Sequence, residues 1–305
     1  GGGEALRYPY RYLATVNTGV PSGLDLDGNG KVGGAGRERG NDAWGYGLHP
    51  GQYGMLVLSR YPIDAQAVRT FQTLPWSALP DAARPVDPAS RRFHYSDAIW
   101  KRLRLSSKSH WDVPVRTPMG TVHFLVSHPT PPVFDGPEDR NGARNADEIR
   151  LWREYVSPGD KPWLCDDRGR CGGLAEDALF AIAGDLNNDP VDGDGRHEAI
   201  VELLEHPRVL RHATPRSEGA AAVAAAYAAP PSRLARACHR RFRTESGNVT
   251  AGLRAAVGRF RATGQRRVLA CGGRCGCGDR RWQRSSSGVG GRQPLRLAVL
   301  GGAAL

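Results

Sequence analysis

Two apolar runs that each stop at a group of polar residues constrain the fold of this chain most. Residues 120–127 ("GTVHFLVS") alternate and end at a histidine-proline pair, and residues 178–183 ("ALFAIA") are continuously apolar and break at Gly184. Both runs predict strands with buried faces. Residues 146–156 ("ADEIRLWREYV") and 197–209 have apolar side chains at helical spacing. The sequence therefore predicts that strands and helices alternate.

The polar residues after these strands suit chemistry on a phosphate ester. His128 follows the first strand, and Asp185 and Asn187 follow the second, where they face the same way if the extended geometry continues. A carboxylate can hold a water or a divalent cation, an amide can donate to a phosphoryl oxygen, and an imidazole can transfer protons near neutral pH. Spacing alone favours the alternative, a satisfied strand-end histidine and an Asx-rich turn.

The positive charge is concentrated in the last third of the chain. The 305 residues carry a net charge of +11, and 40% of them are hydrophobic, which is enough for one large domain or two small ones. Residues 214–305 hold 17 Arg, no Lys and 3 acids, whereas residues 1–213 hold 25 basic and 28 acidic residues. Such a tail predicts either salt-sensitive nucleic-acid binding or a disordered extension. No run approaches the roughly 18 to 20 apolar residues of a membrane span.

The six cysteines fall into two groups. Cys165 and Cys171 flank the turn-like "DDRGR", which a disulfide can close in an oxidising compartment, although two free thiols fit equally well. The other four lie in the tail, where "CGGRCGC" and an upstream Cys-His pair have the ligand types of a zinc site but not the usual spacing. The alternative for the tail cysteines is no site at all.

A second candidate metal site is the loop "DLDGNGKVGG". Its oxygen-bearing residues Asp25, Asp27 and Asn29 stand at alternate positions, as in the first half of an EF-hand-type calcium loop. The twelfth position is Gly36 where such a loop has a bidentate acid, so Glu38 or Asp42 would have to compensate from nearby. The alternative is a Gly/Asp-rich turn that binds nothing.

Several basic residues are candidates for contact with a substrate. "RLSSKSHWDVPV" places Lys108 and His110 beside Trp111, a combination of basic and aromatic residues that nucleic-acid sites use and that ordinary surfaces also show. Arg60 follows another apolar run, and Arg140 lies in the charged loop after His128. Within that loop the charged and amide side chains can contact a substrate or organise one another.

Three motifs in order, "SRYPI", "HFLVSHPTPPVFDGPEDRN" and "IAGDLNNDP", resemble the endonuclease/exonuclease/phosphatase superfamily, which includes pancreatic-type deoxyribonuclease, and are most similar to its exported bacterial members. The resemblance covers residues 8–213. It implies an α/β fold, a four-layer sandwich of two packed mixed β-sheets flanked by helices. It also implies hydrolysis of phosphoester bonds with Mg²⁺ or Mn²⁺ and a secreted or periplasmic location, although this chain shows no signal-peptide pattern.

The resemblance also assigns roles to individual residues. Asp185 would position or deprotonate the attacking water, Asn187 would bind a phosphoryl oxygen, and His128 would assist proton or charge transfer. Asp185 and Asn187 would also be the ligands of the catalytic Mg²⁺. Arg60, His110 and Arg140 are the predicted substrate-binding residues.

Some elements of the family pattern are missing from the sequence. No first-strand asparagine or metal-binding glutamate precedes Tyr8, and no Ser-Asp-His triplet follows Ala213, so we expect residues 1–213 to be a partial domain that is truncated at its N-terminus. We hypothesise that residues 214–305 are an out-of-frame, disordered tail, because permitted codons for residues 283–293, shifted by one base, encode Ser-Asp-His-Arg-Leu-Val-Trp-Val-Asp-Val. The alternative is an ordinary arginine-rich extension.

Three functions compete at this point. The first is a metal-dependent phosphoesterase, a nuclease or phosphodiesterase, whose substrate can be DNA, RNA, a nucleotide or a lipid headgroup. The second is a non-catalytic remnant of the fold that keeps its calcium loop. The third is nucleic-acid binding through the basic tail. The sequence indicates no membrane and no protein partner.

Overall fold

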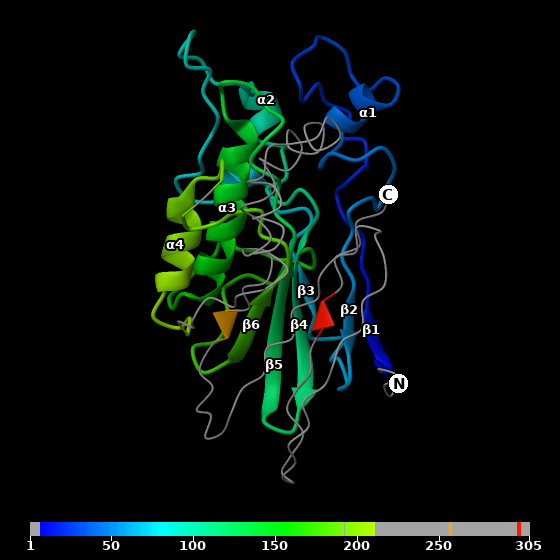
Figure 1. Cartoon of the computed structure of the whole chain (residues 1–305), viewed down its shortest axis with the longest axis vertical. Coiled ribbons are helices and arrows are strands. Elements are labelled where there is room, and N and C mark those ends of the chain that lie inside the picture. The colour runs from blue at the N-terminus through cyan, green and yellow to red at the C-terminus, as the bar shows by residue number, and fades with distance from the viewer. Residues whose placement is uncertain (1–6, 192, 211–255, 258–297, 300–305) are drawn as a thin grey trace, which may run out of the picture.

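The computed structural model describes residues 7–191, 193–210, 256–257 and 298–299, and it contains two β-sheets with the two longest described helices on one side (Figure 1). The strands are β1 (Tyr10–Tyr12), β2 (Val57–Ser59), β3 (Arg69–Thr70), β4 (His110–Thr117), β5 (Gly120–Ser127), β6 (Leu179–Ala183), β7 (Ala256–Val257) and β8 (Ala298–Val299). The helices are α1 (Arg37–Asn41), α2 (Asp97–Trp100), α3 (Arg140–Val156), α4 (His197–Glu205) and a short 3-10 helix, Trp76–Ala78.

The larger sheet is mixed and has the strand order β3-β4-β5-β6-β7. β4 and β5 form an antiparallel hairpin in which His110 is opposite Ser127. β5 and β6 are parallel neighbours, and α3 makes the connection between them, as parallel strands require. The smaller sheet has the order β1-β2-β8, with antiparallel pairs. The two predicted strands therefore lie side by side in one sheet.

Alternation along the strands builds a core on each face of the larger sheet. On one face, Trp111 and Val113 of β4 and Phe124 of β5 pack with Val57 of the smaller sheet. On the other face, Leu125 of β5 lies in the same core as the buried side of α3 and α4. Figure 1 shows these layers, with α3 and α4 on one side of β4, β5 and β6, and β1 and β2 on the other. The predicted α/β sandwich of two packed sheets with flanking helices is confirmed.

Helix α3 forms where the apolar spacing predicts it. Ile149, Trp152 and Val156 are each fully buried and recur at three- and four-residue intervals on the face that meets the sheet. Trp152 also donates its indole N–H to Ser127 Oγ over 2.8 Å, which satisfies a polar atom in the core. Helix α4 ends before Pro207, also as predicted. None of the helices in the described ranges is both long and apolar enough to cross a bilayer.

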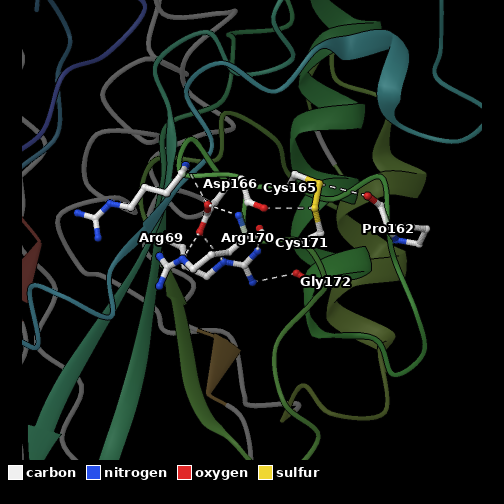
Figure 2. The surroundings of a disulfide bond; sticks show 9 residues. Arg69, Pro162, Cys165, Asp166, Arg170, Cys171 and Gly172 are labelled. Carbon is white, nitrogen blue, oxygen red and sulfur yellow. Dashed lines mark hydrogen bonds and ion pairs between the residues drawn. A yellow bond between two sulfur atoms is a disulfide. The ribbon is translucent and has the colours of Figure 1, made fainter.

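The loop of residues 165–171 is closed by a Cys165–Cys171 disulfide, which decides between the two alternatives for this pair (Figure 2). Inside the loop the buried carboxylate of Asp166 accepts hydrogen bonds from Arg69 Nε at 3.0 Å and Arg170 Nε at 2.8 Å. Burial opposes its ionisation, but hydrogen bonds from the Arg170 and Arg168 backbone, and then from both guanidinium groups, lower its pKa. The loop is thereby fastened to strand β3.

Most of the tail lies outside the described residues. The predictions of a zinc site at Cys238, Cys271, Cys275 and Cys277, of an out-of-frame segment and of nucleic-acid binding all fall there and stay predictions. The two described tail segments are short strands: β7 pairs with β6, and β8 pairs with β2.

Reducing the Cys165–Cys171 disulfide should lower the free energy of unfolding by about 2 kcal/mol, because the bond restricts a loop of this size in the unfolded chain. Urea unfolding with and without dithiothreitol measures the effect. The matched control is the double variant Cys165→Ser/Cys171→Ser, which should start lower and be insensitive to the reductant. An equal loss in both proteins would show that other cysteines respond.

Candidate active site

The ends of β5 and β6 emerge at the same edge of the larger sheet. Val126 pairs with Ala183, the last residue of β6, and the next residue is Gly184. Gly184 has a φ of +144°, and a Cβ on it would lie 1.9 Å from the carbonyl oxygen of Ser127. Only glycine permits this close approach. The polar residues that follow the two strands therefore start next to each other.

The side chain of Asn187 contacts Pro129, the residue after His128. Its side-chain Nδ2 donates to the carbonyl oxygen of Pro129 over 3.1 Å, and its backbone N–H donates to Asp185 Oδ1 over 3.1 Å. The φ of Asn187 is +49°, in the left-handed region that asparagine tolerates better than most residues. Strand geometry does not continue past Ala183, so a turn, and not the predicted alternation, brings the residues 185 and 187 together.

Lys108, in the segment before β4, contacts the same carbonyl group of Pro129. Its Nζ donates to the carbonyl oxygen of Pro129 over 3.2 Å, and the residue is only 4% exposed. Burial lowers the pKa of Lys108 to about 8, against the opposing attraction of Glu148 and Asp185. Lys108, Asn187 and the His128-Pro129 segment thus converge on one carbonyl group.

His128 is held as a neutral imidazole. Burial lowers its pKa well below the ordinary value, and the charge of Lys108 lowers it further, while a hydrogen bond with the backbone of Tyr53 acts in the opposite direction. A neutral imidazole has one nitrogen that donates and one that accepts. It can therefore accept a proton through one nitrogen, becoming an imidazolium, or donate a hydrogen bond through the other while it stays neutral.

Glu148 of α3 fixes the two segments that carry Lys108 and His128. Its buried carboxylate accepts from the backbone N–H of Ser107 at 2.7 Å and from that of Thr130 at 2.6 Å. A third bond, of 3.0 Å, comes from Ser107 Oγ. Glu148 was not predicted from the sequence, because the helix was recognised by its apolar positions alone. An acid within an otherwise buried helical face was the available signal.

Asn145, also on α3, connects the loops that follow β5 and β6. Its Nδ2 donates to the carbonyl oxygens of Thr130 at 2.8 Å and Leu186 at 3.0 Å, and its Oδ1 accepts from Asn188 Nδ2 at 2.8 Å. All of these groups are buried. One helix therefore positions both loops. Asn145 was not predicted from the sequence either.

One of the predicted substrate-binding residues, His110, does not lie at this site. His110 is fully buried in the core, where its ring meets Ser106 Oγ at 2.7 Å, the Glu148 carbonyl oxygen at 2.8 Å and the indole of Trp152. Its side chain cannot reach a substrate from there, so that prediction was wrong, and Lys108 is the residue of the motif that faces the site.

Arg60 is exposed and follows the last residue of β2. Two residues after it, Pro62 accepts a backbone hydrogen bond from Arg116, near the far end of β4. At about 3.4 Å per residue, Arg116 lies about 20 Å along β4 from His110, at the start of that strand. A contact between Arg60 and a substrate stays a prediction.

Arg140 begins α3 and forms an ion pair with Glu138. Its neighbours in the loop after β5 are also engaged: Asp135 accepts from the backbone N–H of Asn141 at 2.6 Å, and Asp139 pairs with Arg196 at 2.8 Å. These side chains organise the loop. A contact between Arg140 and a substrate stays a prediction.

The candidate calcium loop brings three carboxylates together. One oxygen each from Asp25, Asp27 and Asp42 lies within 4.8 Å of the others, and Asp42 is buried. Asp42 also accepts from the backbone N–H groups of Leu26 and Gly33, each at 2.7 Å. This cluster can hold a divalent cation. Of the two acids that were expected to compensate for Gly36, the cluster contains Asp42.

The candidate active site lies within a segment that matches a known protein family. Residues 5–285 match the sequence profile described as the Endonuclease/Exonuclease/phosphatase family. The chain belongs to this family. The family membership supports a hydrolase that acts on phosphoester bonds, and families of this kind generally use divalent metals. Neither the curated proteins nor the solved structures include a match to the chain. The predicted division at Ala213 stays a prediction.

Acidification should destabilise the fold through His110. Burial lowers its pKa from 6.5 to about 4, so the neutral ring contributes stability that is fully present above pH 6.5 and is lost as the pH falls toward 4. The loss amounts to about 3 kcal/mol at pH 4. Urea unfolding of the wild type and of His110→Gln between pH 7.5 and 4 measures it. The variant, although less stable at pH 7.5, should show the smaller loss, and parallel pH curves would contradict the assignment.

Proposed function

We propose that the chain is a metal-dependent phosphoesterase, a nuclease or phosphodiesterase, whose active site contains His128, Asp185 and Asn187. The observation that supports this most directly is the convergence at Pro129, where the segments after β5 and β6 meet the side chains of Asn187 and Lys108. Family membership supplies the reaction class. The buried contacts of Glu148 and Asn145 supply the rigidity that such a site needs.

The donor groups fit a hard divalent cation. In the described part of the chain, Asp185 uses Oδ1 to accept the Asn187 N–H, and Oδ2 has no hydrogen-bond donor. Asn187 donates through Nδ2, which leaves its carbonyl Oδ1 as a possible ligand. Mg²⁺ is commonly held by one or two such oxygens together with waters and substrate phosphate. The bound cation would neutralise phosphate charge and lower the pKa of a water.

The side chains themselves would divide the remaining work. Asp185 is exposed and can position the attacking water or take its proton. Asn187 can donate its second amide hydrogen to a phosphoryl oxygen. Because His128 is neutral, it can accept a proton, and its ring N–H can donate a hydrogen bond. Arg140, at the start of α3 near the loop after β5, would contact the substrate beyond the scissile phosphate.

Asp185→Asn should lower Mg²⁺-dependent hydrolysis about 100-fold or more, because it removes the carboxylate charge and keeps the hydrogen-bond acceptor. The measurement uses a chromogenic phosphodiester and plasmid DNA as substrates. Asp64→Asn is the matched control, since Asp64 pairs with Arg116 at the far end of β4. Equal rates in Asp185→Asn and the wild type would refute the assignment. Activity absent from the wild type would favour the non-catalytic remnant.

The acidic cluster supports a calcium site in the same protein, and we propose that Asp25, Asp27 and Asp42 are its carboxylate ligands. Each carboxylate accepts two or three hydrogen bonds from the loop and from Asn41, which leaves lone pairs on the oxygens for a cation. Asn29 uses its Oδ1 to accept the Lys31 N–H at 2.8 Å. Its predicted ligand role is therefore the weakest of the set.

Calcium at 100 times its dissociation constant should stabilise the wild type by about 2.7 kcal/mol. Asp27→Asn should reduce the shift in melting temperature, because it removes one negative ligand and keeps an acceptor for Asn41. Thermal unfolding with and without Ca²⁺ measures the shift, and Asp64→Asn is again the control. The calcium assignment fails if Asp27→Asn and Asp64→Asn respond to Ca²⁺ equally.

A further inference from the structure

Lys108 is a buried cation with unused hydrogen-bonding capacity. A lysine ammonium group has three N–H donors, and Lys108 Nζ makes a single hydrogen bond within the described residues, to the Pro129 carbonyl oxygen at 3.2 Å. Glu148 and Asp185 attract it, yet neither forms an ion pair with it at contact distance in the described part of the chain. Burial of a charge without full pairing is costly, so this arrangement calls for a further partner.

Lys161 shows what a structural buried lysine looks like in this chain. It is 6% exposed, close to the 4% of Lys108. Its Nζ donates to three carbonyl oxygens beyond the end of α3, at Ser157 (2.8 Å), Pro158 (2.9 Å) and Gly159 (3.4 Å). All three donors of Lys161 are therefore engaged. The two lysines are about equally buried but differ in the number of hydrogen bonds that they donate. Burial alone therefore does not explain why Lys108 donates a single hydrogen bond within the described residues.

The groups around Lys108 indicate which kind of ligand could accept its remaining N–H donors. Its Nζ and the Nδ2 of Asn187 donate to the same oxygen, so the two nitrogens lie close together. Counting only partners among the described residues, each nitrogen keeps at least one N–H for another acceptor. Glu148 is committed to Ser107 and Thr130. An anion with several oxygens suits these two donors, and a phosphoryl group provides them in a compact arrangement.

From this geometry we propose that Lys108 binds a non-bridging phosphoryl oxygen of the substrate, beside Asn187. The proposal rests on the phosphoesterase function and adds a residue to its active site. Lys108 supplies a fixed positive charge where the phosphate binds, and this charge adds to the effect of burial, which favours the neutral imidazole of His128. The same ammonium group thus prepares both the anion site and the proton-transfer group.

Titration calorimetry with inorganic phosphate and with dimethyl phosphate, in the presence of Mg²⁺, tests the proposal without requiring turnover. Lys108→Met should weaken binding of at least one of these anions by about tenfold or more, because a charged hydrogen-bond donor is lost. Lys108→Arg, which keeps the charge, should retain more of the affinity. Lys161→Met, the matched control, should bind as the wild type. Undiminished binding by a folded Lys108→Met, or no binding by the wild type, overturns the proposal.

A second measurement needs no variant. Reductive methylation of the wild type with formaldehyde and cyanoborohydride should modify Lys108 more slowly when inorganic phosphate is present, with exposed Lys101 as the internal reference. Equal modification of Lys108 with and without phosphate contradicts the proposal. Phosphate binding that depends on Lys108, in a protein that hydrolyses nothing, would refute the proposed function alone. If hydrolysis depends on Asp185 but phosphate binding is the same in the wild type and Lys108→Met, this inference alone is refuted.

Discussion

The buried carboxylate of Glu148 is the interaction on which the site depends. A buried carboxylate without partners would cost several kcal/mol, and three hydrogen bonds from Ser107 and Thr130 remove that cost. Those two residues lie directly beside Lys108 and Pro129 in the sequence. Because Glu148 belongs to α3, the helix that connects β5 to β6 also sets the positions of the segments that meet at the site.

The parallel pair of β5 and β6 explains why polar residues gather at one edge. The strands run in the same direction, so His128 and the segment after Gly184 leave the sheet together. Gly184 allows the chains to approach, and Asn145 holds the loops that follow. The apolar cores on the two faces of the sheet are the rigid support. The hydrolytic chemistry that we propose thus depends on contacts far apart in the sequence.

The sequence was sufficient for the elements that have strong local patterns. The two strands and the helix between them could be predicted, because apolar runs and the polar residues at their ends are local features. A shared site of His128, Asp185 and Asn187 stays a prediction. The likeness of three motifs to the endonuclease/exonuclease/phosphatase superfamily was confirmed by the family match. Asp42 was among the acids that the sequence indicated for the calcium loop.

The remaining features depend on partners that the sequence does not place. His110 was misassigned because the groups that bury it, the Glu148 carbonyl and Trp152, come from a helix about 40 residues later. Glu148 and Asn145 were missed because the helical pattern marks only apolar positions and most partners of the two residues are backbone groups, which carry no sequence signal.

An experimental structure of the chain crystallised with Mn²⁺ and inorganic phosphate tests the central claim most directly. We expect the phosphate to contact Lys108 Nζ and Asn187 Nδ2, with His128 adjacent. Mn²⁺, located by its anomalous signal, should be bound by Asp185. Phosphate bound elsewhere, or His128, Asp185 and Asn187 on separate surfaces of the molecule, would contradict the account.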